Sequence, residues 1–438
     1  MPTMNIPFSR HTLDNGLDVL VHEDHNCPIV AVNVWYHVGS KNEKPGRTGF
    51  AHLFEHLMFE GSKHHDKGYF QPLQQAGGTL NGSTNADRTN YWEVVPTNAF
   101  ELALWMESDR MGYLLPALTE AKFQNQRDVV LNERRQNYEN RPYGLAGMSI
   151  VAALYPPDHP YHWLTIGAAD DLRAARLDDV KAFFQTYYRP NNASLALAGD
   201  IRTDDALALA GRYFGELDAG DDPPAVQAAD APPLTHEIRL VLEDRVELPR
   251  IYFAWHSPPL FAAGDAELDL AADVLAGGKT SRLYRRLVYE QRIATEVAAS
   301  HNSREITSFF QLVATAAPGR PLAELEAAIS EEVRRLIEGG PAPIELERSL
   351  AQAEAHFVFR LQTVGGFGGK SDQLNAYNVF LGDPGYFDTD LERYRRATAA
   401  SIQQVAARHL IPARVVLSVV PRGRLELALP GSQPVTVS

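Results

Sequence analysis

Short apolar runs and longer amphipathic stretches alternate along the chain. The runs Leu17 to His22 and Ile29 to His37 predict strands, while the apolar spacing over Glu120 to Glu139 predicts a helix. Strands in hairpin-like runs mixed with long helices are typical of an α+β fold in which helices cover one face of each sheet. The pattern does not fix the order of the strands.

A stretch without helical or strand periodicity divides the chain. Asp218 to Pro233 reads DAGDDPPAVQAADAPP and is typical of a linker. The parts on either side end alike after a shift of 222 positions: Val180 to Asp200 and Ile402 to Pro421 each read as an amphipathic helix, a turn with proline and a strand. The length of 438 residues also exceeds what one core fills. We expect two related domains, 1–217 and 234–438, joined by the linker 218–233.

Composition and charge narrow the class of protein. Apolar residues make up 45% and charged residues 22% of the chain, close to the averages for soluble globular proteins. The 41 basic and 55 acidic side chains give a formal charge of −14, which disfavours nucleic acid and anionic membranes as partners. The longest mostly apolar runs, Ala193 to Ala198 and Val415 to Val420, are far shorter than the roughly 20 residues that cross a bilayer. We expect no membrane span and no nucleic-acid partner.

The cysteine content and the N-terminus bear on the compartment. Cys27 is the only cysteine, so the chain has no internal disulfide and no site built on several thiolates. The first residues lack a basic start followed by an apolar segment, so we expect no signal peptide. These features favour the cytoplasm. The periplasm stays open as an alternative if a signal peptide has been removed.

The segment from Gly49 to Glu60 holds the clearest candidate chemistry. It reads GFAHLFEHLMFE and predicts a helix, on which His52 and His56 lie four residues apart on one face. Both imidazoles can bind one metal ion, and Glu55 lies where it can accept a proton from a water at that ion. This is the H-x-x-E-H pattern of inverted zinc motifs. Histidines at this spacing alone are more often surface or capping residues, but a glutamate in so apolar a stretch is costly to bury without a partner.

Residues elsewhere in the N-terminal half strengthen the resemblance to a known family. Glu133 follows His56 by 77 positions, and Asn15 to Val19, Gly77 to Gly78 and Asn140 to Gly144 also fit. On these residues the chain resembles the pitrilysin, insulin-degrading enzyme and mitochondrial processing peptidase family of inverzincin zinc peptidases, of the small-subunit bacterial type. Read without the family, Glu133 is a solvated helix glutamate that pairs with a neighbouring arginine.

The resemblance implies both a metal and a reaction. It implies Zn²⁺ bound by His52, His56 and Glu133, with Glu55 as the catalytic general base. It further implies two homologous α+β domains, each a mixed, mostly antiparallel sheet with helices packed on it. The first would bear zinc and the second would be non-catalytic. The activity implied is that of a zinc metalloendopeptidase, which hydrolyses peptides or unfolded segments.

The resemblance also implies how substrate is bound. Family members add an extended peptide as a strand to a sheet edge near the metal. The matching segment is Thr79 to Ala86, with Asn81, Gly82, Ser83 and Thr84 as the substrate-binding residues. Read on its own, this segment is a polar strand or loop of small residues.

The C-terminal half departs from the family pattern. Single-chain and homodimeric relatives carry an arginine and a tyrosine there that help to hold substrate. Val288 and Thr295 occupy these positions here, and neither side chain donates hydrogen bonds like Arg or Tyr. Arg282 and Tyr289 have the right spacing but come six residues too early, so we assign them to helix surface. We therefore expect a heterodimer in which a homologous second subunit provides the missing pair.

A second departure is Gln126, seven residues before Glu133, where several relatives have another glutamate. An amide can donate hydrogen bonds near the site but cannot act as a base. Two alternatives to a zinc peptidase subunit remain: a non-catalytic structural or assembly subunit of the same fold, and an unrelated zinc hydrolase.

Overall fold

The computed structural model describes residues 4–226 and 231–436, which form two compact units. Each unit is assembled from separate stretches of the chain. The first unit comprises residues 4–132, 164–226 and 356–389, and the second comprises residues 133–163, 231–355 and 390–436. Segments from distant parts of the sequence therefore pack within one unit.

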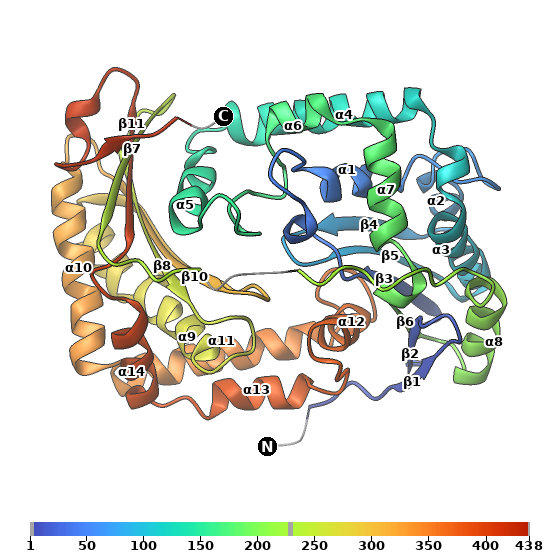
Figure 1. The fold of residues 1–438 in the computed structure, drawn as a ribbon. Helices are drawn as coiled ribbons and strands as arrows, with labels where there is room; N and C mark the ends of the chain where they lie inside the picture. The colour runs from blue at the N-terminus through green and yellow to red at the C-terminus, as the bar shows by residue number, and fades with distance from the viewer. Residues whose placement is uncertain (1–3, 227–230, 437–438) are drawn as a thin grey trace. The chain divides into compact units, whose positions relative to one another are not determined.

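The first unit is built on a six-stranded sheet with the order β1-β2-β6-β3-β5-β4 (Figure 1). β2 and β6 are parallel, and all other neighbours are antiparallel. β6 is buried at every position, which its small and apolar sequence ASLALAG permits. β4 forms one edge of the sheet. The strands are β1 (Ser9–Thr12), β2 (Asp18–Glu23), β3 (Ile29–Tyr36), β4 (Thr79–Thr84), β5 (Thr89–Pro96) and β6 (Ala193–Gly199).

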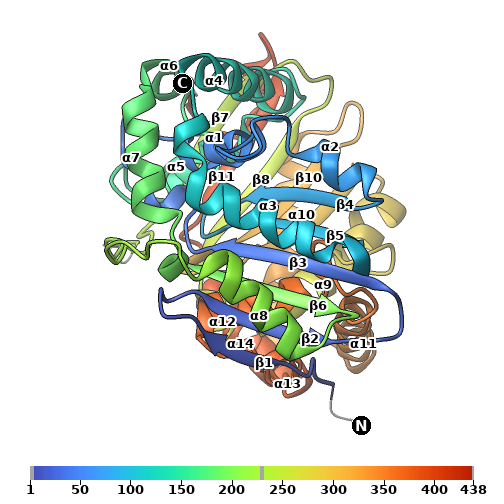
Figure 2. The same ribbon diagram turned by 90° about the vertical axis from the view of Figure 1, so that its right-hand side faces the viewer.

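Helices lie on both faces of this sheet. Figure 2 looks onto the face that α3 and α8 cover, and α12 packs on β6 and β3 from the opposite face. The expectation of helices on one face is wrong, because a helix from the distant segment 356–389 covers the second face. The helices are α1 (Phe50–Leu57), α2 (Phe70–Gln75), α3 (Phe100–Tyr113), α4 (Glu120–Arg134), α6 (Ala169–Ala174), α7 (Leu177–Tyr187), α8 (Thr203–Phe214) and α12 (Lys370–Leu381).

The second unit contains a sheet of the same design. Its strand order is β12-β7-β11-β8-β10-β9, so β7 to β11 repeat the arrangement of β2 to β6. β11 pairs with β7 in parallel and with β8 in antiparallel fashion, as β6 does with β2 and β3. The protein is thus an α+β protein with two homologous sheets. The strands are β7 (Ile238–Asp244), β8 (Arg250–Ser257), β9 (Ala294–Asn302), β10 (Ser308–Ala316), β11 (Val415–Pro421) and β12 (Gln433–Pro434).

The core of the second unit lies between its sheet and three helices, α9, α10 and α14. α5 packs on β11 and β8, so this sheet too receives a helix from the other end of the chain. α11 and α13 run across the boundaries between the units. The helices are α5 (Ala146–Leu154), α9 (Asp265–Ala276), α10 (Leu322–Gly339), α11 (Pro343–Arg360), α13 (Phe387–Arg395) and α14 (Ala399–His409).

The expected linker contains no regular structure where it is described. Residues 218–226 and 231–233 form neither helix nor strand, and residues 227–230 lie outside the described residues. Every strand of the first sheet precedes the linker and every strand of the second follows it. The domain boundaries at 217 and 234 stay a prediction. Within the described part of the chain, no helix is both long and apolar enough to cross a bilayer.

Candidate metal centre

Helix α1 carries both histidines of the motif, and a buried carboxylate holds its first turn. Gly49 precedes the helix with a φ of 88°, a conformation that glycine adopts at little cost. The Glu43 carboxylate accepts hydrogen bonds from the backbone N–H groups of Gly49 and Ala51, each at 2.9 Å. These bonds satisfy donors that a helix start leaves without a partner, and they place negative charge at the positive end of the helix dipole. The start of α1 is therefore fixed in position and direction.

The opposite face of α1 is fixed by aromatic packing. Leu53, Phe54 and Leu57 are buried. The Phe54 ring stacks on Phe183 and Phe184 of α7, with ring centres 5.9 and 5.6 Å apart. Burial of this face sets the rotation of the helix about its axis, so the two histidines project together from the other side.

His52, His56 and Glu133 come together in space. The imidazole rings lie 4.9 Å apart between centres, at 84° to one another. One ligand atom from each of the three side chains lies within 4.8 Å of the other two, and no second group of this kind occurs among the described residues. Glu133 lies in the last turn of α4. Two imidazoles and one carboxylate are the donor set of a catalytic zinc site with an open position.

The protonation state of His52 suits metal binding. Burial, and to a smaller extent the charge of nearby His56, lowers the pKa of His52 to about 4. His52 is therefore neutral at physiological pH. A neutral imidazole is the form that binds a metal ion, so no proton has to leave this ring first.

Glu55 lies on the same helix, one residue before His56, and is half-buried. Burial raises the pKa of the hydroxyls of Tyr91 and Tyr188, and the negative charge of Glu55 contributes to the rise. Both phenols therefore stay neutral at physiological pH, and the Glu55 carboxylate is close enough to affect both. A carboxylate with partial access to solvent beside two imidazoles can accept and return a proton.

A buried charged cluster joins α3 to β5, the strand that pairs with β4. Arg110 of α3 bonds to Glu107 and, at 3.3 Å, to Glu93 of β5. Its guanidinium lies 4.0 Å from the ring centre of Tyr69 and 4.2 Å from that of Tyr91. Sequence reasoning missed this cluster. The one signal is the charged Glu93 at an inward position of a mostly apolar strand.

The segment after α1 docks along α4. Gln126 donates a hydrogen bond to Glu60, and Lys122, one turn earlier on α4, forms an ion pair with Asp66. Gln126 is thus a hydrogen-bond donor near the site, as its amide allows. A glutamate at this position would face the Glu60 carboxylate directly and repel it.

The predicted substrate residues lie on the edge strand β4, which packs against α1. Asn81 is exposed, Gly82 is buried, and Ser83 and Thr84 are half-buried. The Ser83 hydroxyl donates a hydrogen bond to the Asn90 side chain of β5 at 2.6 Å. This bond adds a side-chain link between β4 and its neighbouring strand. The role of these residues in substrate binding stays a prediction.

The residues singled out in the second half belong to the second unit. Val288 packs partly buried against the core of the second unit, and Thr295 donates to the carbonyl of Thr315 at 3.4 Å. Arg282 is half-buried and bonds to both carboxylate oxygens of Glu345, at 2.8 and 2.6 Å. Tyr289 is 76% exposed, as a surface residue is.

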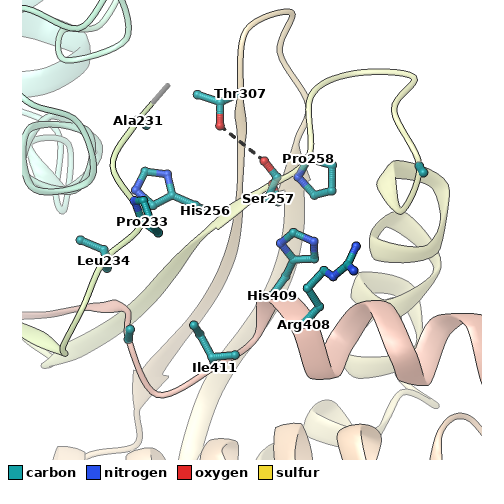
Figure 3. Close-up of a pocket in the computed structure, with 12 residues that line it drawn as sticks. Ala231, Pro233, Leu234, His256, Ser257, Pro258, Thr307, Arg408, His409 and Ile411 are labelled. Atoms are coloured by element: carbon teal, nitrogen blue, oxygen red, sulfur yellow. Dashed lines mark hydrogen bonds between the residues drawn. The ribbon is translucent and has the colours of Figure 1, made fainter. Parts of the chain in front are cut away.

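A separate surface pocket occurs in the second unit, with a volume of about 440 Å³ (Figure 3). His256 and His409 line it together with Arg408 and Ser257. Burial lowers the pKa of both His256 and His409, so both rings are neutral at physiological pH. Within the described residues, no third side chain completes a metal site with them.

Comparison with known proteins places the chain in a family. Residues 18–156 match the family model described as Insulinase (Peptidase family M16), and residues 174–353 match the Peptidase M16 inactive domain. Zinc protease PqqE of Helicobacter pylori is 31% identical over 357 residues, which is 80% of each chain. The chain belongs to peptidase family M16. The family resemblance expected from the sequence is confirmed.

Other proteins are similar to this chain in sequence or in fold. The crystal structure of a protease from Helicobacter pylori superposes with a TM-score of 0.87 at 26% identity, covering 95% of this chain and all of that one. The beta subunit of the mitochondrial-processing peptidase of Caenorhabditis elegans is 25% identical over 244 residues, 56% of this chain and 51% of that one. An M16 inactive-domain protein from Pseudomonas fluorescens shares the fold at a TM-score of 0.84 and 17% identity.

Proposed function

We propose that this M16 protein is a zinc metallopeptidase that hydrolyses peptides or unfolded segments. The observation that carries the proposal is the convergence of ligand atoms from His52, His56 and Glu133 within 4.8 Å of one another. Relatives named zinc proteases, such as PqqE of Helicobacter pylori, favour the same activity. The donor set and the neutral state of His52 fit zinc.

His52, His56 and Glu133 would hold the ion, and Glu55 would act on the attacking water. When bound, zinc supplies Lewis acidity and lowers the pKa of a water molecule at the site. Glu55 then accepts a proton from the water that attacks the peptide carbonyl. The same carboxylate returns the proton to the leaving amine, which completes hydrolysis.

The edge strand β4 would orient the substrate. A peptide that adds to this edge forms backbone hydrogen bonds, which fix its direction while tolerating varied side chains. Asn81, Gly82, Ser83 and Thr84 would then lie along the substrate backbone. The packing of β4 on α1 favours a scissile bond next to the metal ligands.

Replacing Glu55 with Gln tests the catalytic assignment. The amide keeps the size of the side chain but cannot accept the proton, so we expect hydrolysis to fall by at least about a hundredfold. Zinc content, measured by mass spectrometry, should stay at the wild-type level. Glu120→Gln, at the exposed start of α4, serves as the control. Full turnover by the Glu55 variant would refute the role of Glu55 as the general base. A wild-type protein that binds zinc but hydrolyses no peptide, even with its co-purifying subunits, would favour a non-catalytic assembly subunit.

We further propose that a homologous second subunit completes the enzyme. Val288 and Thr295 stand where an arginine and a tyrosine would hold substrate, and Val288 packs, partly buried, against the apolar core of the second unit. Purification of the native complex followed by mass spectrometry would identify the partner. Full peptidase activity from the isolated chain, as a monomer or homodimer, would exclude the heterodimer.

The cytoplasm is the compartment that we propose. The exposed Cys27 is the only cysteine, so the fold does not depend on an oxidising environment. Cell fractionation with an antibody against the chain tests this, and recovery in the periplasmic fraction would contradict it.

A further inference from the structure

The free edge of β4 has a defined set of backbone groups. At the turn of the β4–β5 hairpin, the Asn85 N–H donates a hydrogen bond to the Arg88 carbonyl at 3.0 Å, so Asn85 and Arg88 form a hydrogen-bonded pair. Residue pairs alternate along an antiparallel ladder, and the register from Thr84–Thr89 to Thr79–Val94 is continuous. Ser83 and Asn81 therefore direct their backbone groups toward β5.

The alternate residues of β4 direct their backbone toward the free edge. These residues are Leu80, Gly82 and Thr84. A peptide that adds to this edge as a strand would pair with their N–H and carbonyl groups. The Gly82 groups lie in the middle of this set.

The Gly82 N–H is already hydrogen-bonded within the chain. It donates to the side-chain oxygen of its neighbour Asn81 at 2.8 Å. Asn81 is exposed while Gly82 is buried, as expected if the Asn81 side chain folds over the edge. The amide oxygen thus occupies the position that a substrate carbonyl would take.

Aromatic rings leave little space beside Gly82 on the face of β4 that a side chain at this position would occupy. A Cβ at this position would lie 3.0 Å from Cδ1 of Tyr91 and 3.1 Å from Cζ of Phe59. The strand is pressed against these rings, so it cannot move inward to break the bond to Asn81. Release of the N–H depends on rotation of the Asn81 side chain.

We propose that Asn81 is a positioning residue that caps the free edge of β4 in the unbound protein and must swing away when an extended peptide adds to the edge. This inference rests on the proposed function, because it concerns the same substrate edge. The cap competes with substrate backbone for one donor. It also protects an edge strand from pairing with other chains.

If Asn81 caps the edge, removing its side chain should strengthen peptide binding. If Asn81 instead contacts the peptide, the same change should weaken binding. A neutral hydrogen bond that must be broken weakens binding by about three- to tenfold. We expect Asn81→Ala to bind peptide three- to tenfold more tightly, because the donor is then free. Asn81→Asp should bind more weakly than wild type, since a carboxylate accepts a stronger hydrogen bond from the Gly82 N–H.

Binding is measured in the Glu55→Gln background with zinc present, so that no peptide is cleaved. The probe is a fluorescein-labelled peptide of alternating valine and lysine, followed by fluorescence anisotropy. Asn302→Ala, on the edge strand β9 of the other sheet, is the matched control and should leave affinity unchanged. Weaker or unchanged binding by Asn81→Ala would overturn the proposal, because the side chain would then hold substrate or not compete with it.

Amide hydrogen exchange at Gly82 gives a readout that needs no catalysis. In the free protein, Asn81→Ala should exchange the Gly82 proton faster than wild type, and addition of the peptide should slow it again. An unchanged exchange rate in the variant contradicts the cap and leaves the proposed peptidase intact. A wild-type protein that binds zinc but hydrolyses nothing contradicts the peptidase and leaves the exchange result standing.

Discussion

Arg110 is buried together with the carboxylates that it binds. Burial raises the pKa of Glu93, and the nearby Glu107 raises it further, whereas the positive charge of Arg110 opposes both effects. Tyr69 and Tyr91 enclose the guanidinium from two sides. The Arg110 guanidinium therefore balances the charges of two buried acids, Glu93 and Glu107, next to Tyr91 of β5.

Replacing Arg110 with Met removes the cation and leaves Glu93 and Glu107 buried without a counter-charge. We expect the free energy of unfolding to fall by about 3–5 kcal/mol, as when one partner of a buried ion pair is removed. Urea denaturation measures this. Arg212→Met, which breaks the exposed pair with Glu101, should cost no more than about 1 kcal/mol. Equal losses in the two variants would contradict the account of the cluster.

The Glu43 carboxylate holds the first turn of α1, the helix that carries His52 and His56. Replacing it with Ala removes the acceptor for the N–H groups of Gly49 and Ala51, so we expect a loss of about 1–2 kcal/mol in stability. Because the first turn of α1 then frays next to His52, zinc affinity should fall as well. Competition with a fluorescent zinc chelator measures this affinity. Glu43→Gln retains an acceptor oxygen and should lie between wild type and Glu43→Ala.

At the scale of elements, a buried carboxylate on α12 gathers several hydrogen bonds from the first sheet. Asp372 accepts hydrogen bonds from Asn33 at 3.2 Å, Trp35 at 2.8 Å and Asn90 at 3.1 Å. The N–H of Gly368 also donates to it, at 2.7 Å. Four donors satisfy a charge that is almost fully buried, and together they define where this helix lies on the sheet.

Asp372→Ala should leave the three side-chain donors buried and unsatisfied. We expect a loss of about 3 kcal/mol or more, measured by chemical denaturation. Asp372→Asn keeps the shape but has one acceptor oxygen, so its loss should be smaller. The control is Asp383→Asn in the exposed turn after α12. If α12 were held by apolar packing alone, Asp372→Ala would resemble this control.

Lys370, at the start of α12, pairs with Asp24 at the end of β2 at 2.6 Å. The hydrogen bond from Lys370 lowers the pKa of Asp24 to about 2, below the unfolded value of about 3.9. The stabilisation is therefore complete above about pH 4 and is lost as the pH falls toward 2. We expect Lys370→Met to cost about 1 kcal/mol at pH 7 and about half of that at pH 3. A difference that stays constant with pH in urea titrations would rule out this pair as the cause.

Local patterns were enough to predict the metal helix, but not the partners of distant elements. His52 and His56 share one helix face because of their spacing, which is a property of a short stretch of sequence. Asp372 lies 339 positions from Asn33, and no periodicity reveals such a contact. The packing of α12 on the first sheet and of α5 on the second depends on tertiary contacts, and so does the pairing of Arg110 with Glu93.

At the scale of the whole molecule, the two sheets share one design, but the helices α1 and α9 carry different side chains. The first copy places two histidines on α1, whereas the corresponding helix of the second copy, α9, carries Asp269. Asp269 accepts a hydrogen bond from Tyr394 at 2.6 Å and lies 3.2 Å from the ring nitrogen of His301. Those contacts link α9 to β9 and α13. The Asp269 carboxylate is therefore engaged by Tyr394 and His301. Among the described residues, no group of three potential metal ligands occurs around it.

Zinc-dependent hydrolysis by the purified protein, with any subunit that co-purifies, tests the central claim most directly. A quenched fluorescent peptide is assayed before chelation, after removal of metal, and after addition of one equivalent of Zn²⁺. We predict that chelation abolishes cleavage, that zinc restores it, and that Glu133→Ala fails to recover because the third ligand is missing. Cleavage that survives complete removal of metal, or no cleavage by a zinc-loaded complex, would contradict the assignment of His52, His56 and Glu133 to a catalytic centre.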